Sequence, residues 1–165
     1  MSAFHFFSRP SRGDPAPSFS LRSMSGAEIA LDDFRGRPVL LHYWATWCGV
    51  CRQEFPSLIA FAREMAPEGL VLLAISEDGA GGEGAIDEFF RFESPPFPIL
   101  LDPEGAAADA YMSWGVQETV LVDSDGLIMW RRAGPVDWNG PEMRALVREV
   151  AATAKPRDLR GPGNE

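Results

Sequence analysis

The chain contains two cysteines, Cys48 and Cys51, with two residues between them. They follow an apolar run at residues 39–44 that is typical of a strand, and a helical pattern begins directly after them. A cysteine in the first turn of a helix faces unpaired backbone N–H groups and the positive end of the helix dipole, and both stabilise a thiolate. Cys51 lies about one helical turn later, so its sulfur can bond that of Cys48 with little backbone movement. The spacing therefore predicts a redox-active pair in which Cys48 attacks a disulfide and Cys51 resolves the mixed disulfide.

Glu54 lies three residues after Cys51, on about the same face of the expected helix. A partly desolvated carboxylate at this place can pass a proton to or from the resolving thiol. Alternatively, Glu54 is a glutamate on the solvent-exposed face of the helix and takes no part in the chemistry.

Other interpretations of the cysteine pair are weaker. A structural disulfide would close a very short loop and add little loop-closure entropy. A zinc site would need two further ligands, and only His42, His5 and carboxylates are available. His42 lies inside the apolar run, where a histidine is more often a hydrogen-bonded core residue, so we expect it to act as a modulator only.

Residues 44–56, which contain both cysteines and Glu54, resemble the signature of the TlpA/ResA-like thioredoxin-fold oxidoreductases. This family includes the DsbE-type proteins of cytochrome c maturation, and the resemblance extends from about residue 16 to residue 154. It implies that Cys48 is the exposed nucleophile, Cys51 the resolving thiol and Glu54 the active-site glutamate. It also implies protein thiol or disulfide substrates and an upstream redox partner. No cofactor or metal is expected, because the dithiol carries the electrons.

The chain departs from this family at Gln117, which stands where the family usually has a cis-proline opposite the dithiol. A cis bond before a non-proline residue costs about 2.5–4 kcal/mol, so we expect either a trans bond or local strain. In the family, this loop pairs with the backbone of the substrate and shields the dithiol from metal. We expect an apolar docking surface for an extended protein substrate, formed by Trp44, Trp47, Val116 and Gln117.

The composition of the 165 residues, with 45% hydrophobic and 24% charged residues, is that of one globular domain. The net charge of −9 disfavours nucleic acids and anionic membranes as partners, since both reward clustered lysine and arginine. No segment approaches the roughly 20 apolar residues of a membrane span, and the N-terminus lacks the pattern of a secretion signal. The family resemblance implies a periplasmic location, and the N-terminal residues are consistent either with a cytoplasmic start or with an N-terminus that has been trimmed. We expect a monomer.

Patterns along the chain predict a mixed sheet with helices on both faces. In chain order, we expect a hairpin at 19–31, a strand at 39–44, a helix after the dithiol, a strand at 70–75, a helix at 85–92, a strand at 99–102, a helix at 105–112, a hairpin at 118–131 and a helix at 141–150. This order predicts a thioredoxin-like α/β/α sandwich with an N-terminal β-hairpin and a central αβ insertion. The domain is expected at 18–154, between a mobile lead at 1–17 and a disordered tail at 155–165.

Two local features of this plan bear on the site. The acidic, glycine-rich segment 76–84 is expected as a loop near the active-site edge, because it follows a parallel strand. The aromatic face of the helix at 85–92, with Phe89, Phe90 and Phe92, is expected in the core.

The sequence as a whole favours a thiol–disulfide oxidoreductase that exchanges its dithiol with protein substrates. A binding or chaperone module is the alternative, with little redox turnover and with Trp114 and the Gln117 loop holding a partner. A peroxidase of the peroxiredoxin type is disfavoured, because no proline lies shortly before Thr46. The direction of electron flow stays open, since Gly49 and Val50 give no decisive indication of the potential.

Overall fold

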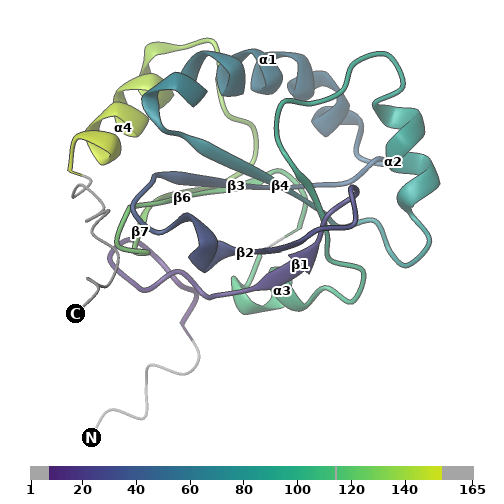
Figure 1. The fold of residues 1–165 in the computed structure, drawn as a ribbon, viewed down its shortest axis with the longest axis horizontal. Coiled ribbons are helices and arrows are strands. Elements are labelled where there is room, and N and C mark those ends of the chain that lie inside the picture. Colours follow the sequence, from purple (N-terminus) through teal and green to yellow (C-terminus); the bar gives the residue numbers. More distant parts are fainter. Residues whose placement is uncertain (1–7, 114, 154–165) are drawn as a thin grey trace, which may run out of the picture.

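The sheet at the centre of the molecule has five strands in the order β5-β4-β3-β6-β7. Figure 1 labels β4, β3, β6 and β7 side by side. The computed structural model describes residues 8–113 and 115–153. β3 pairs in parallel with β4, and β4 in parallel with β5, whereas β6 lies antiparallel to both β3 and β7. The strands are β3 (Val39–Trp44), β4 (Val71–Ser76), β5 (Ile99–Leu101), β6 (Glu118–Val122) and β7 (Ile128–Ala133). The predicted mixed sheet is confirmed.

Both faces of the sheet are covered, which explains why β3 and β4 are continuous runs of buried residues. Along β3, Leu40 and Trp44 belong to one hydrophobic cluster, and Leu41 and Tyr43 belong to the other. One face packs against α1 and α4, and the opposite face against α3 and the β1–β2 hairpin (Figure 1). These elements are α1 (Gly49–Met65), α3 (Ala106–Ala110), α4 (Pro141–Ala152), β1 (Ser20–Arg22) and β2 (Glu28–Ala30).

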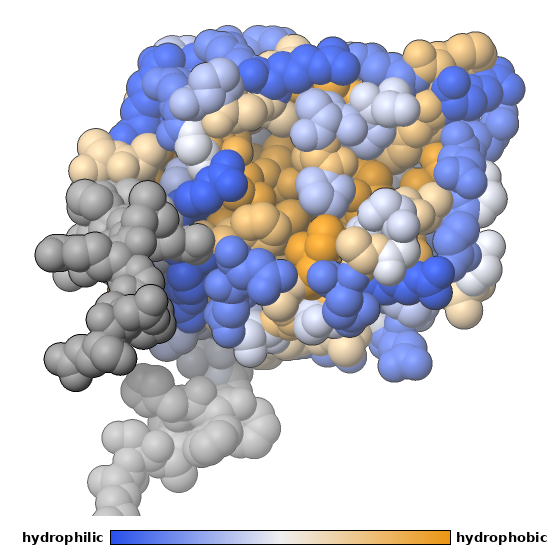
Figure 2. Space-filling view, viewed as in Figure 1, coloured by the Kyte–Doolittle hydropathy of each residue, from blue (hydrophilic) through white to orange (hydrophobic). Residues whose placement is uncertain are grey.

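The layers enclose apolar residues, as expected of an α/β/α sandwich. On the face shown in Figure 2, apolar side chains gather in the middle of the molecule and hydrophilic side chains surround them. The N-terminal hairpin forms a separate two-stranded sheet at the edge of β5. There, the N–H of Met24 donates to the carbonyl of Ile99 at 2.9 Å.

The segment before the hairpin contacts the domain from Arg9 onward. The N–H of Gly13 donates to the carbonyl of Ile128, and the N–H of Ala16 donates to that of Gly126, each at 2.8 Å. The first seven residues of the expected lead at 1–17, and all of the expected tail at 155–165, lie outside the described residues.

One prediction about the core is wrong. The central insertion contains α2 (Glu83–Phe89), and Phe89 and Phe90 pack against the core, but Phe92 is 87% exposed. The helix ends at Phe89, so Phe92 no longer follows the apolar face of the helix. Its ring instead lies beneath the guanidinium of Arg91, 4.3 Å from the ring centroid to Cζ. Among the described residues, no helix is long and apolar enough to cross a bilayer.

Candidate active site

The dithiol lies where β3 passes into α1. Cys48 is the N-cap of α1 in an extended conformation, and the N–H of Cys51 donates to its sulfur at 3.2 Å. The two cysteines are joined by a disulfide, and their Cα atoms are 5.3 Å apart. Cys48 is 6% exposed, whereas Cys51 is completely buried. The first turn of the helix thus directs a backbone donor at the more accessible sulfur, which would stabilise a thiolate there after reduction.

The two tryptophans next to the dithiol occupy different environments. Trp47 is 69% exposed beside Cys48. Trp44 is completely buried, with its ring centroid 4.8 Å from that of Phe55 and 4.9 Å from that of Phe89. The prediction that Trp44 contributes to a docking surface is therefore wrong, because strand alternation turns its side chain into the core. It supports the junction of β3 and α1 from beneath.

Asp78 holds the loop between β3 and α1, and the sequence analysis did not identify it. Its carboxylate accepts the N–H of Thr46 at 3.1 Å and the hydroxyl of Thr46 at 2.5 Å. Ser76, at the end of β4, also donates to it at 2.7 Å. The segment 76–84 thus contacts the active-site loop, as its place after a parallel strand suggested. The two acidic residues that follow that strand, Glu77 and Asp78, were the available signal.

The Glu54 carboxylate is buried, with only 8% of the residue exposed. Its Oε2 accepts the side-chain N–H of Gln117 at 3.0 Å, and its Oε1 accepts the indole N–H of Trp138. Burial raises the pKa of Glu54, and these two donors, with the backbone of Val136, oppose part of that rise. Glu54 is therefore not a solvated glutamate on the helix surface. Sequence reasoning missed Trp138, which lies in an irregular segment between β7 and α4.

The loop that carries Gln117 contains strain in φ and no cis peptide bond; no cis bond occurs among the described residues. Gln117 has a φ of 63°, in the left-handed region that side chains rarely adopt. Its N–H donates to the carbonyl of Tyr43 at 2.8 Å, and its carbonyl accepts the N–H of Gly134 at 3.0 Å. Val116 packs partly against the core. Trp114, which the binding hypothesis used, lies outside the described residues.

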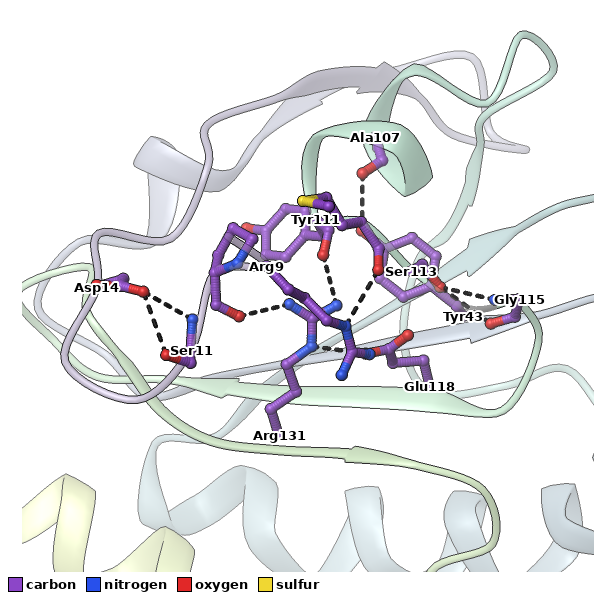
Figure 3. Close-up of polar contacts among 12 residues, drawn as sticks. Arg9, Ser11, Asp14, Tyr43, Ala107, Tyr111, Ser113, Gly115, Glu118 and Arg131 are labelled. Atoms are coloured by element: carbon purple, nitrogen blue, oxygen red, sulfur yellow. Dashed lines mark hydrogen bonds and ion pairs between the residues drawn. The ribbon is translucent and has the colours of Figure 1, made fainter. Parts of the chain in front are cut away.

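A buried ion cluster anchors this loop from the opposite face of the sheet (Figure 3). The carboxylate of Glu118 pairs with Arg131 at 2.6 Å and also with Arg9. Arg131 donates to the carbonyl of Tyr111 at 2.5 Å, and Arg9 donates to that of Met112 at 3.1 Å. Because successive residues of a strand point to opposite faces, this cluster lies away from Glu54. It connects β6, β7 and the N-terminal segment to the start of the loop.

His42 is a core histidine, as its place in an apolar strand suggested. It is completely buried, and its Nδ1 lies 3.0 Å from the hydroxyl of Thr119. Its ring makes edge contacts with those of Phe55 and Trp138. Burial lowers the pKa of His42 to about 4, so the ring is neutral at physiological pH.

A groove beside the dithiol separates the active-site loop from α2. It is lined by Thr46, Trp47, Arg52, Ala85, Glu88, Phe89, Arg91 and Phe92. Its walls combine exposed aromatic rings with two guanidinium groups. In the part of the chain that the structure describes, no group of three or more His, Cys, Asp or Glu residues could hold a metal ion.

Comparisons with known proteins agree with this geometry. A family model described as the AhpC/TSA family matches residues 12–131. The chain is 36% identical over 116 residues to the thioredoxin-like protein YneN of Bacillus subtilis, and the match covers 70% of this chain and 68% of YneN. It is 31% identical over 121 residues to the thiol-disulfide oxidoreductase ResA of the same organism, covering 72% of this chain and 65% of ResA.

A DsbE protein gives a similar match. The thiol:disulfide interchange protein DsbE of Allochromatium vinosum is 34% identical over 125 residues, and the match covers 74% of this chain and 67% of that protein. Among solved structures, that of a DsbE-type protein from Chlorobium tepidum has a TM-score of 0.77 at 26% identity, covering 86% of this chain and 99% of the other. The chain thus spans about two thirds of the length of YneN, ResA and this DsbE.

Proposed function

We propose a mechanism for this chain on the basis of its family. The chain belongs to the AhpC/TSA family and is similar to the ResA- and DsbE-type thiol–disulfide oxidoreductases. The Cys48–Cys51 pair exchanges its disulfide with protein thiols through a mixed disulfide. The observation that carries the proposal is the place of the pair at the start of α1. There, Cys48 keeps 6% of its surface exposed and accepts a helix-terminal N–H, and Cys51 is completely buried one turn behind it.

The reduced pair would act in two steps. The Cys48 thiolate attacks a substrate disulfide, forms a Cys48–substrate disulfide and releases one substrate sulfur as a thiolate, which takes a proton from solvent. Cys51 then gives its proton to the Glu54 carboxylate and attacks the Cys48 sulfur, which releases the second substrate sulfur. Two electrons pass to the substrate, and the Cys48–Cys51 disulfide forms. The same steps in reverse oxidise a substrate dithiol.

The surface around Cys48 supports a polypeptide substrate. Trp47 and Val50 expose apolar area on either side of the nucleophile, and the groove between Trp47 and Phe92 continues it along α2. We propose that an extended substrate segment lies in this groove, with Val116 and Gln117 at the other side of the dithiol. Trp44 acts only from beneath this surface.

Trapping of the mixed disulfide tests the order of attack. Cys51→Ser should accumulate a covalent adduct with a disulfide-containing peptide, because the resolving thiol is absent. Cys48→Ser is the matched control and should form little adduct, because Cys51 is buried. Equal trapping by the two variants would contradict the assignment.

The reduction potential of the pair tests the function itself and its direction. It can be measured by equilibrating the protein in graded thiol buffers and following tryptophan fluorescence. A value near the roughly −270 mV of thioredoxin would indicate a reductant, and one near the roughly −120 mV of strong oxidants would indicate a disulfide donor. If no reversible change between the disulfide and the dithiol is seen, the oxidoreductase proposal is wrong and the binding-module hypothesis takes its place.

A further inference from the structure

The Glu54 carboxylate is held by two side-chain donors from segments far away in the sequence. Gln117 comes from the loop before β6, 63 residues after Glu54, and its Nε2 donates to Oε2 at 3.0 Å. Trp138 comes from the segment between β7 and α4, 84 residues after Glu54, and its indole N–H donates to Oε1. Each carboxylate oxygen therefore has its own donor, and together they fix the plane of the carboxylate.

The backbone of Gln117 is held separately from its side chain. Its N–H and carbonyl are both engaged, with the carbonyl of Tyr43 and the N–H of Gly134. A proline at this position would have neither the backbone N–H nor a side-chain donor. Gln117 keeps its strained φ of 63° where β6 begins beside β3. From there, its side-chain amide reaches the carboxylate of Glu54 on α1. Strain that the surroundings hold in place is typical of functional sites.

We propose that Gln117, together with Trp138, is a positioning residue that holds the Glu54 carboxylate ionised and in place behind the dithiol, and thereby sets the pH range of the resolving step. The proposal rests on the proton-transfer role that we propose for Glu54. On this proposal, glutamine in place of proline supports proton transfer by Glu54. This effect is separate from any effect on how the substrate is presented to the dithiol.

The electrostatics around Glu54 make these donors decisive. Burial raises the pKa of Glu54, and the influences that lower it are hydrogen bonds from Trp138, Gln117 and the backbone of Val136. Cys51 on α1 and His42 on β3 are titratable groups near Glu54, and burial keeps His42 neutral above its pKa of about 4. Asp137, beside Trp138, is exposed and accepts the N–H groups of Asn139 and Gly140, and Arg144 on α4 is paired with Glu64. Glu118, next to Gln117, points to the opposite face and is paired with Arg131. No charged side chain thus replaces the two donors in keeping the carboxylate ionised.

Removal of the Gln117 donor tests the proposal. In Gln117→Met, the pH at which the resolving step reaches half its maximal rate should move upward by about one unit, because a hydrogen bond to an ionised group is lost. On the acidic limb, the rate should fall about tenfold, with the plateau rate at high pH retained. The rate is measured as the release of a thiol from the pre-formed mixed disulfide at different pH values. Gln53→Met, at an exposed neighbour on α1, is the matched control and should leave the profile unchanged.

Two further variants separate the donor from the backbone. Asparagine tolerates the left-handed region but is one methylene shorter, so Gln117→Asn should shift the profile as methionine does. If Gln117→Asn behaves like the unsubstituted protein while Gln117→Met does not, backbone conformation is responsible and the proposal is overturned. Trp138→Phe keeps an aromatic ring but loses the indole N–H, so the pH profile of the resolving step should also move upward. An unchanged profile would count against the hydrogen-bond clamp, by which we mean the two donors Gln117 and Trp138 on the Glu54 carboxylate.

Direct titration of the Glu54 carboxyl by NMR distinguishes this proposal from the one that it rests on. If Glu54→Gln leaves the pH profile of the resolving step intact, the proton-transfer role of Glu54 fails. The clamp is then judged by the titration alone. An upward shift of the Glu54 titration in Gln117→Met supports the hydrogen-bond clamp, and an unchanged titration overturns it.

Discussion

The protonation of His42 should make the fold sensitive to acid. The ring is completely buried, with one hydrogen bond to Thr119 and edge contacts to the rings of Phe55 and Trp138. Burial disfavours the imidazolium and lowers the pKa of His42 from 6.5 to about 4. The unfolded chain, in contrast, takes up the proton near the ordinary value. Unfolding is therefore coupled to the uptake of one proton between these two pH values.

The sign and size of the effect follow from linkage. Within this window the unfolded state binds more protons, so stability falls as the pH falls, by about 1.4 kcal/mol per pH unit. Over the interval from 6.5 to about 4, the loss amounts to about 3 kcal/mol. His42→Leu removes this titration, so the stability of the variant relative to the parent should rise by that amount on acidification.

Urea denaturation of the oxidised protein at several pH values from 7.5 to 4 provides the measurement. The leucine variant leaves the Thr119 hydroxyl without its partner, which costs about 1–3 kcal/mol at every pH, so the slope against pH is the readout. The double variant with Thr119→Val removes that offset and should show the same slope. Glu54 titrates in both proteins and cancels in the difference. A difference in stability that stays constant between pH 7.5 and 4 would refute a neutral, buried His42.

Three further predictions concern other buried polar groups. The pKa of Glu54 is raised in the folded state, so stability is lost as the pH rises from the unfolded pKa of about 4.3 through the folded pKa. Glu54→Gln should therefore raise the melting temperature at pH 7 but not at pH 4. A lower melting temperature at pH 7 would contradict this. Asp78→Ala removes the acceptor of the Thr46 N–H and hydroxyl. The Thr46 amide hydrogen should then exchange faster with solvent, and the free energy of unfolding should fall by about 1–3 kcal/mol. Unchanged exchange would show that other contacts hold the loop. Glu118→Gln removes the carboxylate that pairs with the partly buried Arg131 and should cost about 2–4 kcal/mol in urea denaturation. A cost below about 1 kcal/mol would mean that the cluster contributes little to stability.

The features that the sequence predicted well are local. The spacing of Cys48 and Cys51 and the change from a strand pattern to a helix pattern lie within one short segment, and they suffice to place the sulfur pair at the start of α1. The uninterrupted apolar runs of β3 and β4 predict parallel strands covered on both faces, and the hairpin at 118–131 predicts the antiparallel part of the sheet.

The features that it missed depend on contacts between distant segments. Whether Glu54 is buried is decided by Trp138 and Gln117, and neither residue carries a pattern that marks it as its partner. The burial of Trp44 could have been predicted from the sequence. Trp44 lies four residues after Leu40 in the same strand, so both side chains point to the same face of the sheet, toward α1. The exposure of Phe92 depended on where α2 ends, and helix ends are poorly determined by propensity.

The antiparallel pairing of β3 with β6 separates the cysteine pair from the helix that forms the far wall of the groove. Tyr43 of β3 is opposite Glu118 of β6, so the end of one strand, which leads to Cys48, lies beside the start of the other. The chain between β4 and β6, with α2, β5 and α3, departs from and returns to this fixed edge (Figure 1). That excursion supplies the α2 wall of the groove but neither cysteine. Substitutions at exposed groove-lining positions such as Glu88 and Phe92 would therefore re-shape what the groove admits. They would leave the cysteine pair and the contact of Asp78 with Thr46 in place, so that one redox centre can act on different substrates.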